Sequence, residues 1–236
     1  MLTLEQKWDK RVHEWHSHVT SAAAFDKVLR RLIEVSSPRQ GDSCVDLGAG
    51  AGDVSVALAE LVGREGRVYA VDSDPLARDE VARTAAAHTQ VIALTQAGED
   101  LILPERVDLA FCRFLLLHVR DPAVVVRRMA AVVRPGGWVV AQEPITSAGR
   151  VAGMPLSMPD ARHPDIGALL PSLVREAGLD VIDAWAEAPA GVGEGPVSHY
   201  LESLTGVDPG DDPVVLPPLV TVLGRRPSAG SGAANL

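Results

Sequence analysis

Short apolar segments between residues 43 and 142 alternate with stretches of helical periodicity, and this alternation constrains the fold more than any other feature. Strands are predicted over residues 43–47, 67–72, 90–95, 107–112 and 138–142, and helices over 54–62, 75–88 and 122–133. Strands separated by helices of about ten residues form βαβ units, which require a parallel sheet with right-handed crossovers. The sequence therefore predicts an α/β fold.

Further elements are predicted on both sides of this region. Amphipathic helices are expected over residues 4–19 and 22–35, a helix over 165–177, a strand over 179–186, a short helix over 197–204 and a closing strand over 219–224. Residues 144–164 contain several prolines and are predicted to be a loop or a broken cap. We expect an N-terminal helical lid over residues 1–36, the main domain over 37–227 and a disordered tail over 228–236.

Composition excludes several classes of function. The chain has 236 residues, 47% of them hydrophobic, and a formal net charge of −9, so it can bury a core and repels phosphate backbones and anionic membranes. The two cysteines, Cys44 and Cys112, lie in apolar runs, too few for a disulfide framework and not at metal-site spacing. The sequence shows no signal-peptide pattern and no apolar run of about 18 residues, so a cytoplasmic setting is expected.

A glycine-rich loop, VDLGAGAGD, follows the first predicted strand of the alternating region and leads into a helix. Glycines at this place let the backbone turn sharply and approach a ligand closely. Asp46 precedes the glycines inside the strand, and Asp72 ends the next strand. A carboxylate at that second position can accept hydrogen bonds from both hydroxyls of a ribose, beside the point where the strand order of an open sheet reverses. The pattern indicates a nucleoside-containing ligand.

The residue that follows the glycines indicates which nucleoside. A dinucleotide-binding loop has a third glycine where this chain has Asp53, and a carboxylate there would repel a pyrophosphate. A ligand without phosphate and with positive charge fits better. S-adenosylmethionine, with a sulfonium, an ammonium and a ribose, is favoured over NAD on this charge argument.

At residues 40–145 the chain resembles the class I S-adenosylmethionine-dependent methyltransferases, in their small-molecule branch. VDLGAGAGD is similar to their first motif, AVDSDP to the acidic end of their second strand, VDLAFCRFLLLHVRDP to their fourth motif and VRPGGWVVAQEP to their turn into the fifth strand. The resemblance implies a Rossmann-like, seven-stranded, mostly parallel sheet with helices on both faces and an N-terminal helical lid. It also implies S-adenosyl-L-methionine as the cofactor.

The resemblance assigns cofactor contacts position by position. The glycines should border the methionine part and the ribose, Asp46 should orient the loop, Asp72 should hold the ribose hydroxyls, and Ser73 should lie next to the adenine. The family has an acid at the position of Ala97, so adenine contacts are expected to pass to Gly98 and Glu99. Arg113 should lie near the methionine end. The complete expected set is Asp46, Gly48, Ala49, Gly50, Gly52, Asp72, Ser73, Gly98, Glu99 and Arg113.

Methyl transfer to a hydroxyl or an amine calls for a general base on the acceptor side. The candidates are His118, Glu143 and His163, each with a plainer interpretation. His118 follows FLLL on an expected helix and reads as a structural histidine, Glu143 reads equally well as a polar residue at the rim of the crevice, and His163 reads as a solvent-exposed loop residue. His13, His16 and His18 lie on a charged helix without further ligands, so no metal is expected.

Three functions stay open on the sequence alone. The favoured one is an enzyme that methylates O, N or C of a small-molecule acceptor, in bacterial secondary metabolism, without nucleic acid or membrane partners and with a homodimer left open. The second is a methyltransferase-fold protein that binds the cofactor but catalyses another reaction, such as a cyclisation, or serves as a binding module. A nucleotide-dependent oxidoreductase is the third.

Overall fold

The computed structural model describes residues 34, 38–156, 161–205 and 208–228. The chain divides into two compact units. The large unit takes in Ser36–Pro144, Pro159–Ala186 and Leu219–Leu236, and the small unit takes in Met1–Val35, Ile145–Met158 and Glu187–Pro218. The predicted lid and tail, and the helices expected over 4–19 and 22–35, lie almost entirely outside the described residues and stay predictions.

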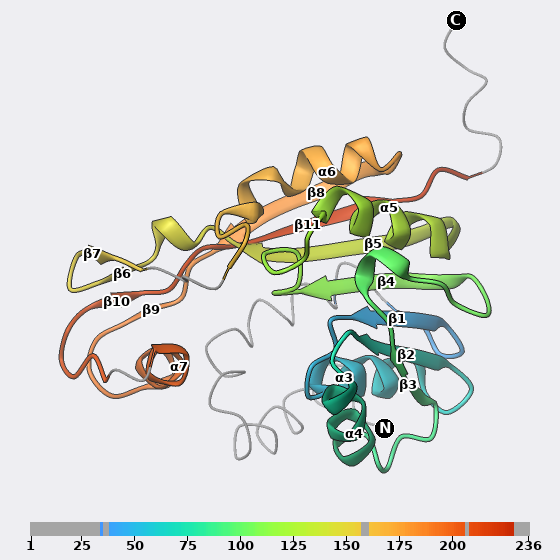
Figure 1. The fold of residues 1–236 in the computed structure, drawn as a ribbon, viewed down its shortest axis with the longest axis horizontal. Helices are drawn as coiled ribbons and strands as arrows, with labels where there is room; N and C mark the ends of the chain where they lie inside the picture. The colour runs from blue at the N-terminus through green and yellow to red at the C-terminus, as the bar shows by residue number, and fades with distance from the viewer. Residues whose placement is uncertain (1–33, 35–37, 157–160, 206–207, 229–236) are drawn as a thin grey trace, which may run out of the picture. The chain divides into compact units, whose positions relative to one another are not determined.

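The large unit is built on a seven-stranded sheet of order β3-β2-β1-β4-β5-β11-β8 (Figure 1). Its strands are β1 (Ser43–Leu47), β2 (Arg67–Asp72), β3 (Val91–Thr95), β4 (Val107–Arg113), β5 (Val133–Pro144), β8 (Asp180–Glu187) and β11 (Leu219–Arg225). The strands from β3 to β5 run parallel, and β11 is antiparallel to β5. The predicted seven-stranded, mostly parallel sheet is confirmed.

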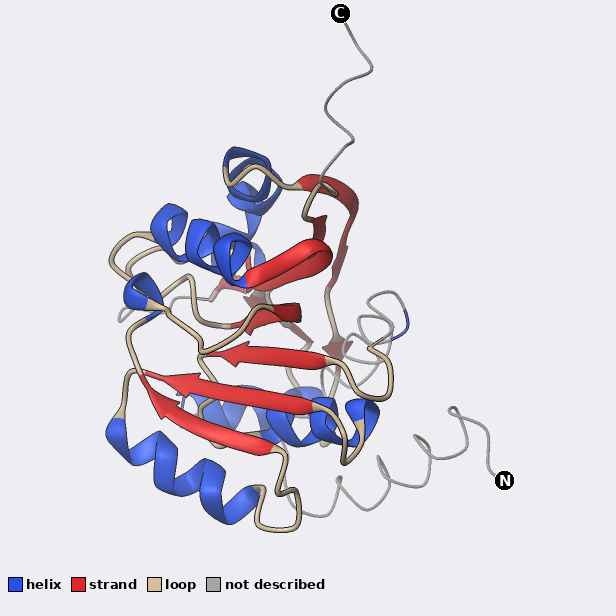
Figure 2. Cartoon of the chain, turned by 90° about the vertical axis from the view of Figure 1, so that its right-hand side faces the viewer, coloured by secondary structure: helices blue, strands red, loops and turns tan. Residues whose placement is uncertain are grey.

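Helices cover this sheet in two pairs. The pairs are α3 (Asp53–Val62) with α4 (Pro75–Thr84), which pack on β1, β2 and β3, and α5 (Pro122–Val132) with α6 (Leu170–Glu176), which pack on β4, β5 and β11. Strand order runs outward from β1 in one direction and from β4 in the other, so right-handed crossovers place the two pairs on opposite faces. Figure 2 shows the strands as red arrows among the blue helices.

Local sequence explains where α4 and α5 begin. Asp74 accepts a hydrogen bond from the Leu76 amide at 2.9 Å, and Asp121 accepts one from the Val124 amide at 3.0 Å. Proline follows each aspartate, at the first helical position, where its missing N–H costs nothing. The core beneath these helices consists of apolar strand residues, and both cysteines are buried in it.

Strand β5 is longer than the predicted strand over 138–142. It begins at Val133, and its pairing with β4 jumps from Val107–Val133 to Leu109–Trp138. The skipped residues 134–137 are the predicted Arg-Pro-Gly-Gly turn, which forms a bulge inside the strand rather than a connection before it.

The small unit contains a four-stranded antiparallel sheet that the sequence did not predict. The strands are β6 (Arg150–Val151), β7 (Met154–Pro155), β9 (Ala190–Gly191) and β10 (Val214–Val215), in the order β7-β6-β10-β9. Residues 144–164 are therefore not a loop throughout, because β6 and β7 form a hairpin there. The helix expected over 197–204 is present as α7 (Pro196–Thr205).

Candidate active site

The glycine loop joins the end of β1 to the start of α3, and the neighbouring strand fixes its conformation. The amides of Gly48 and Ala49 donate to the carbonyl oxygen of Val71, the residue before the end of β2, at 2.8 and 3.1 Å. Gly50 has a φ of +51°, and a Cβ added there would meet no described atom within 4 Å. The loop therefore presents exposed backbone beside open space at Gly50, as close approach of a ligand requires.

Asp72 braces this loop while keeping capacity for a ligand. Its Oδ2 accepts a hydrogen bond from the Gly50 amide and its Oδ1 accepts one from the Asp74 amide, each at 2.9 Å. Each carboxylate oxygen can accept a second hydrogen bond, and Asp72 is only half-buried. The carboxylate can thus serve two further donors, as the two hydroxyls of a ribose would be.

Asp46 lies beneath the loop rather than in the open. Its side chain is 2% exposed, and its Oδ2 accepts a hydrogen bond from the Ser55 hydroxyl of α3 at 2.6 Å. Burial raises the pKa of Asp46 to about 6, against the lowering effect of the Ser55 hydrogen bond, and Asp72 and Asp53 raise it further. Sequence reasoning missed Ser55. Its position in the first turn of the helix after the glycines was the available signal.

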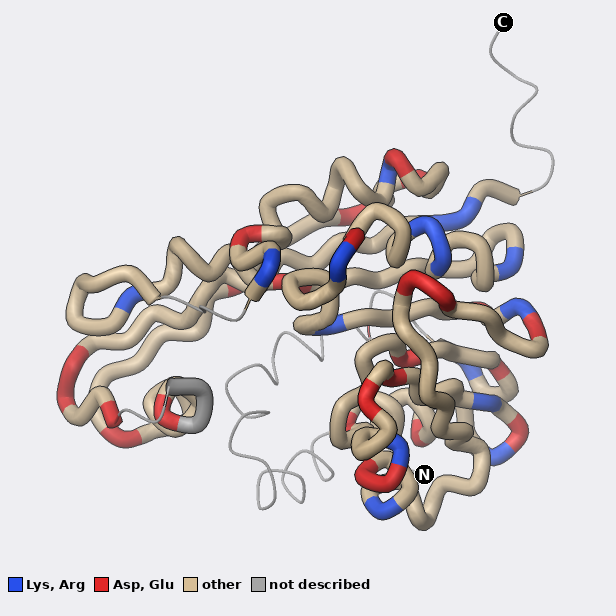
Figure 3. The backbone as a smooth tube through the Cα atoms, in the orientation of Figure 1, with Lys and Arg blue, Asp and Glu red and all other residues tan. Residues whose placement is uncertain are grey.

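Arg113 provides the positive charge of this cluster. It ends β4, the neighbour of β1, and its charge lowers the pKa values of Asp46 and Asp53, which burial raises. The glycine loop, three aspartates and one arginine thus meet where the strand order reverses between β1 and β4. Acidic residues, red in Figure 3, occur in both units of this chain of net charge −9.

Two of the predicted cofactor contacts, Ala49 and Gly98, pack against other parts of the protein, and a third, Ser73, is exposed. Ala49 is 9% exposed and packs with Ala70 and Val81. Gly98 is buried, and a Cβ there would lie 3.3 Å from Val125 of α5. Ser73 is exposed at the end of β2.

Glu99 has partners at the start of α5. Its Oε1 accepts hydrogen bonds from the amides of Arg120 and Asp121, at 3.0 and 3.4 Å. Burial raises the pKa of Glu99. The hydrogen bonds from these two amides and from the Glu99 backbone amide outweigh that effect, so the pKa is lowered overall. This carboxylate therefore supports the start of α5, and its contact with the adenine stays a prediction.

The three catalytic candidates gather at one segment, residues 114–118 after β4, which we name the post-β4 turn. The predicted helix around His118 is wrong. These residues form a turn, and His118 is exposed with its amide donating to the Leu115 carbonyl at 2.9 Å. The interpretation of His118 as a buried structural histidine therefore fails as well.

Glu143 lies at the other side of this turn and is fully buried. Its Oε1 accepts hydrogen bonds from the amides of Leu115 and Leu116 at 2.9 and 2.7 Å, and its Oε2 accepts one from Leu117 at 3.4 Å. Burial raises the pKa of Glu143 to about 7, opposed by these amides. It is neither a rim residue nor open to a substrate proton in this conformation.

His163 joins the turn from the segment before α6. Its amide donates to the Leu117 carbonyl at 3.0 Å, and its side chain is half-buried. The ring nitrogen Nε2 is buried and meets no hydrogen-bond partner among the described residues. Of the three candidates, His163 is therefore the one with a buried ring nitrogen that has no partner among the described residues.

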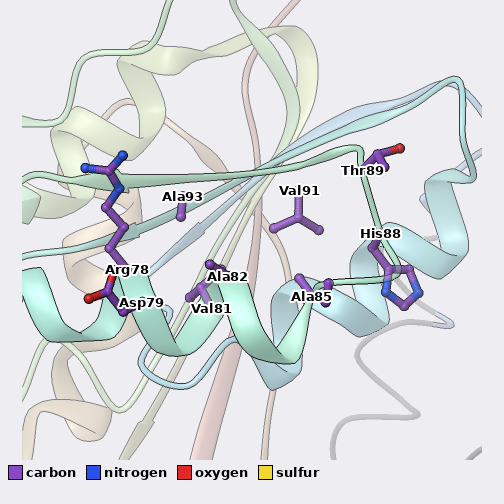
Figure 4. A pocket seen from close by; sticks show the side chains of 10 residues that line it. Arg78, Asp79, Val81, Ala82, Ala85, His88, Thr89, Val91 and Ala93 are labelled. Carbon is purple, nitrogen blue, oxygen red and sulfur yellow. The ribbon is translucent and has the colours of Figure 1, made fainter.

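A separate hollow of about 640 Å³ lies between α4 and β3, lined by residues such as Val81, Ala85 and Ala93 (Figure 4). None of the polar residues around the glycine loop lines it, so it is not the candidate site. Within the described ranges, no three His, Cys, Asp or Glu side chains come together as metal ligands. No helix in the described part of the chain is long and apolar enough to cross a membrane.

Comparison with known proteins agrees with this geometry. Residues 45–141 match the family model described as a methyltransferase domain. A dimethylglycine N-methyltransferase of Parasynechococcus marenigrum is 28% identical over 71% of this chain and 58% of its own length. A ubiquinone biosynthesis O-methyltransferase of Xylella fastidiosa is 33% identical over 55% of this chain and 51% of its own length. The chain thus matches between half and three-fifths of the length of these two relatives.

Among solved structures, the [4+2]-cyclase SpnF superposes with a TM-score of 0.64 at 17% identity, covering 86% of this chain and 82% of that one. At this identity the likeness concerns the fold alone. The family model agrees with three features of the structure. These are the strand order of the sheet, the glycine loop after β1 and the aspartate that ends β2. The match to the family model and the strand order of the sheet together support a class I S-adenosylmethionine-dependent methyltransferase domain over residues 45–141.

Proposed function

We propose that this protein transfers a methyl group from S-adenosylmethionine to O, N or C of a small-molecule acceptor. The observation that carries the proposal is the acidic cluster at the glycine loop. Asp72 accepts the Gly50 amide beside open space, and the charges of Asp72 and Asp53 both act on the buried Asp46. Such a site suits a ligand with positive charge and without phosphate. Both an N- and an O-methyltransferase stand among the relatives, so the acceptor atom stays open.

The residues divide the binding task by position. Asp72 would accept hydrogen bonds from the ribose hydroxyls with the lone pairs that Gly50 and Asp74 leave free. Arg113 and Asp53 would face the carboxylate and the ammonium of the methionine part. Asp46 would hold the loop from below through Ser55. The cofactor supplies an activated methyl group on a sulfonium, so the protein's share is to align the acceptor and to exclude water.

On the acceptor side, His163 is the base that we favour. Its Nε2 is buried and has no partner among the described residues, whereas the Glu143 carboxylate accepts three amide hydrogen bonds. An imidazole nitrogen can accept a proton from a hydroxyl or an amine, and His163 can do so where the acceptor-bound conformation exposes Nε2, which this structure encloses. The proposal retains the expectations of a cytoplasmic setting and of bacterial secondary metabolism, and it leaves a homodimer open.

The cofactor proposal is tested by calorimetry with S-adenosylmethionine, its demethylated product S-adenosylhomocysteine, and NAD. We expect both adenosyl compounds to bind and NAD not to bind. Asp72→Ala should weaken binding roughly tenfold or more, because two charge-assisted hydrogen bonds to the ribose are lost. Asp74→Ala, which removes the exposed cap of α4 two residues away, is the matched control and should bind as the wild type does. Equal affinities for wild type and Asp72→Ala would remove Asp72 from the site.

The second reading, a cofactor-binding protein that catalyses another reaction such as a cyclisation, is favoured by one observation. The only acceptor-side carboxylate among the predicted candidates, Glu143, is enclosed and already accepts three amide hydrogen bonds. Release of S-adenosylhomocysteine on incubation with a panel of small phenols, amines and carbon acids distinguishes the two. Turnover that His163→Ala reduces about a hundredfold supports methyl transfer with His163 as base. Tight binding without product release supports the second reading.

A further inference from the structure

The Glu143 carboxylate is the one candidate group whose geometry points to a task other than proton transfer. We propose that Glu143 is a positioning residue, which holds the post-β4 turn in the conformation that seats Leu115 against Gly48 of the glycine loop. This inference rests on the proposed function, since it assigns a residue that shapes the cofactor crevice without touching the ligand.

The first step is the convergence of donors. Three successive amides, of Leu115, Leu116 and Leu117, point at one carboxylate, with N–O distances of 2.9, 2.7 and 3.4 Å. Successive backbone amides that point at one anion form a nest, which a carboxylate can organise. Leu116 and Leu117 are fully buried, so water cannot replace Glu143 as their acceptor. The amides of Leu115, Leu116 and Leu117 therefore depend on this one side chain for their acceptor.

The second step is the strain in the turn. Phe114 has a φ of +52°, in the left-handed region that side chains rarely adopt. Its amide donates to the Gln142 carbonyl at 3.1 Å, so the turn leaves β4 while still tied to β5. Such a conformation persists only when its surroundings impose it. Glu143, the residue after Gln142, is the group that imposes it.

The third step is the contact with the crevice. A Cβ built on Gly48 would lie 3.0 Å from Leu115 Cδ1 and 3.1 Å from Leu115 Cβ, so Leu115 lies directly against Gly48. Two residues further along, the Gly50 amide donates to Asp72. A shift of the turn would therefore move the side chain on which the glycine loop packs. At its other end, the turn accepts a hydrogen bond from the His163 amide at the Leu117 carbonyl.

The test compares Glu143→Leu and Glu143→Gln with Thr221→Val. The control removes the Thr221 hydroxyl of β11, which accepts a hydrogen bond from the side chain of Gln142 on β5 at 2.7 Å; both residues are buried. The turn is bonded to Gln142 through the backbone carbonyl, which this substitution leaves in place. Two quantities are measured. These are the hydrogen-exchange protection of the amides of residues 115–117 without any ligand, and the affinity for S-adenosylhomocysteine.

Glu143→Leu should lower both quantities roughly tenfold or more, because three buried amides lose their acceptor. Glu143→Gln keeps one acceptor oxygen and should recover part of both. Thr221→Val should lower overall stability while leaving local protection and affinity within about twofold of the wild type. If Glu143→Leu does not fold, the decision rests on Glu143→Gln, which should still lose about threefold in each quantity.

The proposal would be overturned if a folded Glu143 variant showed wild-type exchange protection and wild-type affinity for S-adenosylhomocysteine. It would also be overturned if Thr221→Val lost as much protection and affinity as the Glu143 variants. The outcome is separable from that of the proposed function. If the wild type itself binds neither S-adenosylmethionine nor S-adenosylhomocysteine, the proposed function fails. The exchange measurement then still decides whether Glu143 holds the turn.

Discussion

Gly50 is the residue whose substitution tests the crevice most directly. Its φ of +51° disfavours any side chain, and open space lies where a Cβ would stand. We predict that Gly50→Val abolishes measurable binding of S-adenosylhomocysteine in calorimetry, because the side chain fills the space that the ligand needs. The strain should also lower the free energy of unfolding by about 1–2 kcal/mol.

Gly178→Val is the matched control for this prediction. Gly178 also has a positive φ, +79°, and open space around it, but it follows α6 and has no place in the crevice. It should show a similar loss of stability with unchanged affinity. Binding by Gly50→Val at wild-type strength would show that the ligand lies elsewhere.

At the residue scale, the sequence predicted positions better than roles. Asp46, Asp72 and the glycines could be found because a strand end followed by glycines places them locally. Glu143 was predicted as a catalytic candidate without its partners, because these are amides almost thirty positions away in the sequence. Contacts of that kind depend on how β4 and β5 pair, which no local pattern reports.

The elements around Glu99 give a second prediction. This residue lies in η1 (Gly98–Asp100), and its carboxylate accepts the amides of Arg120 and Asp121 just before α5 begins. We predict that Glu99→Ala lowers the free energy of unfolding by about 1 kcal/mol, the usual contribution of a helix-terminal hydrogen bond, and leaves cofactor affinity unchanged. Denaturant unfolding and calorimetry on the same preparation measure the two quantities.

Asp121→Ala, which removes the cap of α5 itself, sets the scale for that loss. Both variants should lose stability to a similar degree because both act on the start of one helix. A tenfold loss of affinity in Glu99→Ala alone would restore the sequence-based assignment of Glu99 to the adenine.

At the element scale, the regular alternation of strands and helices made most of the large unit predictable. The apolar run Phe114–Leu117 was predicted to be helical because its composition favours a helix. In the structure its amides donate to the Gln142 carbonyl and the Glu143 carboxylate, instead of to carbonyls one turn back. The small unit's strands are two residues long. Strands this short are too brief to show the alternation of apolar and polar residues that predicts a strand. They also pair residues that are far apart in the sequence, such as Val151 with Val214.

For the whole molecule, two buried carboxyls link stability to pH. Burial raises the pKa of Asp46 from 3.8 to about 6 and that of Glu143 from 4.5 to about 7. A carboxyl whose pKa is raised by folding contributes stability that is fully present below its unfolded pKa. That contribution is lost as the pH rises through the folded pKa. Between about pH 4 and pH 7, these two groups therefore make the folded state less stable as the pH rises.

We predict that the free energy of unfolding falls between pH 5 and pH 8 by about 1–2 kcal/mol through Asp46 and about 2–3 kcal/mol through Glu143. Denaturant unfolding of the wild type at both pH values, compared with Glu143→Gln, measures the contribution of Glu143. The variant has no carboxyl to ionise at this position, so its stability should fall less than that of the wild type over the same interval.

Glu105→Gln is the control, because the pKa of Glu105 is lowered by its hydrogen bonds with Tyr69 and Arg67, so its titration lies below this interval. Its stability should follow the pH dependence of the wild type. If Glu143→Gln and the wild type lost equal stability between pH 5 and pH 8, Glu143 would already be ionised at pH 5. The three amides of the post-β4 turn would then outweigh the burial of the carboxylate, which would make Glu143 a permanent anion at the edge of the crevice.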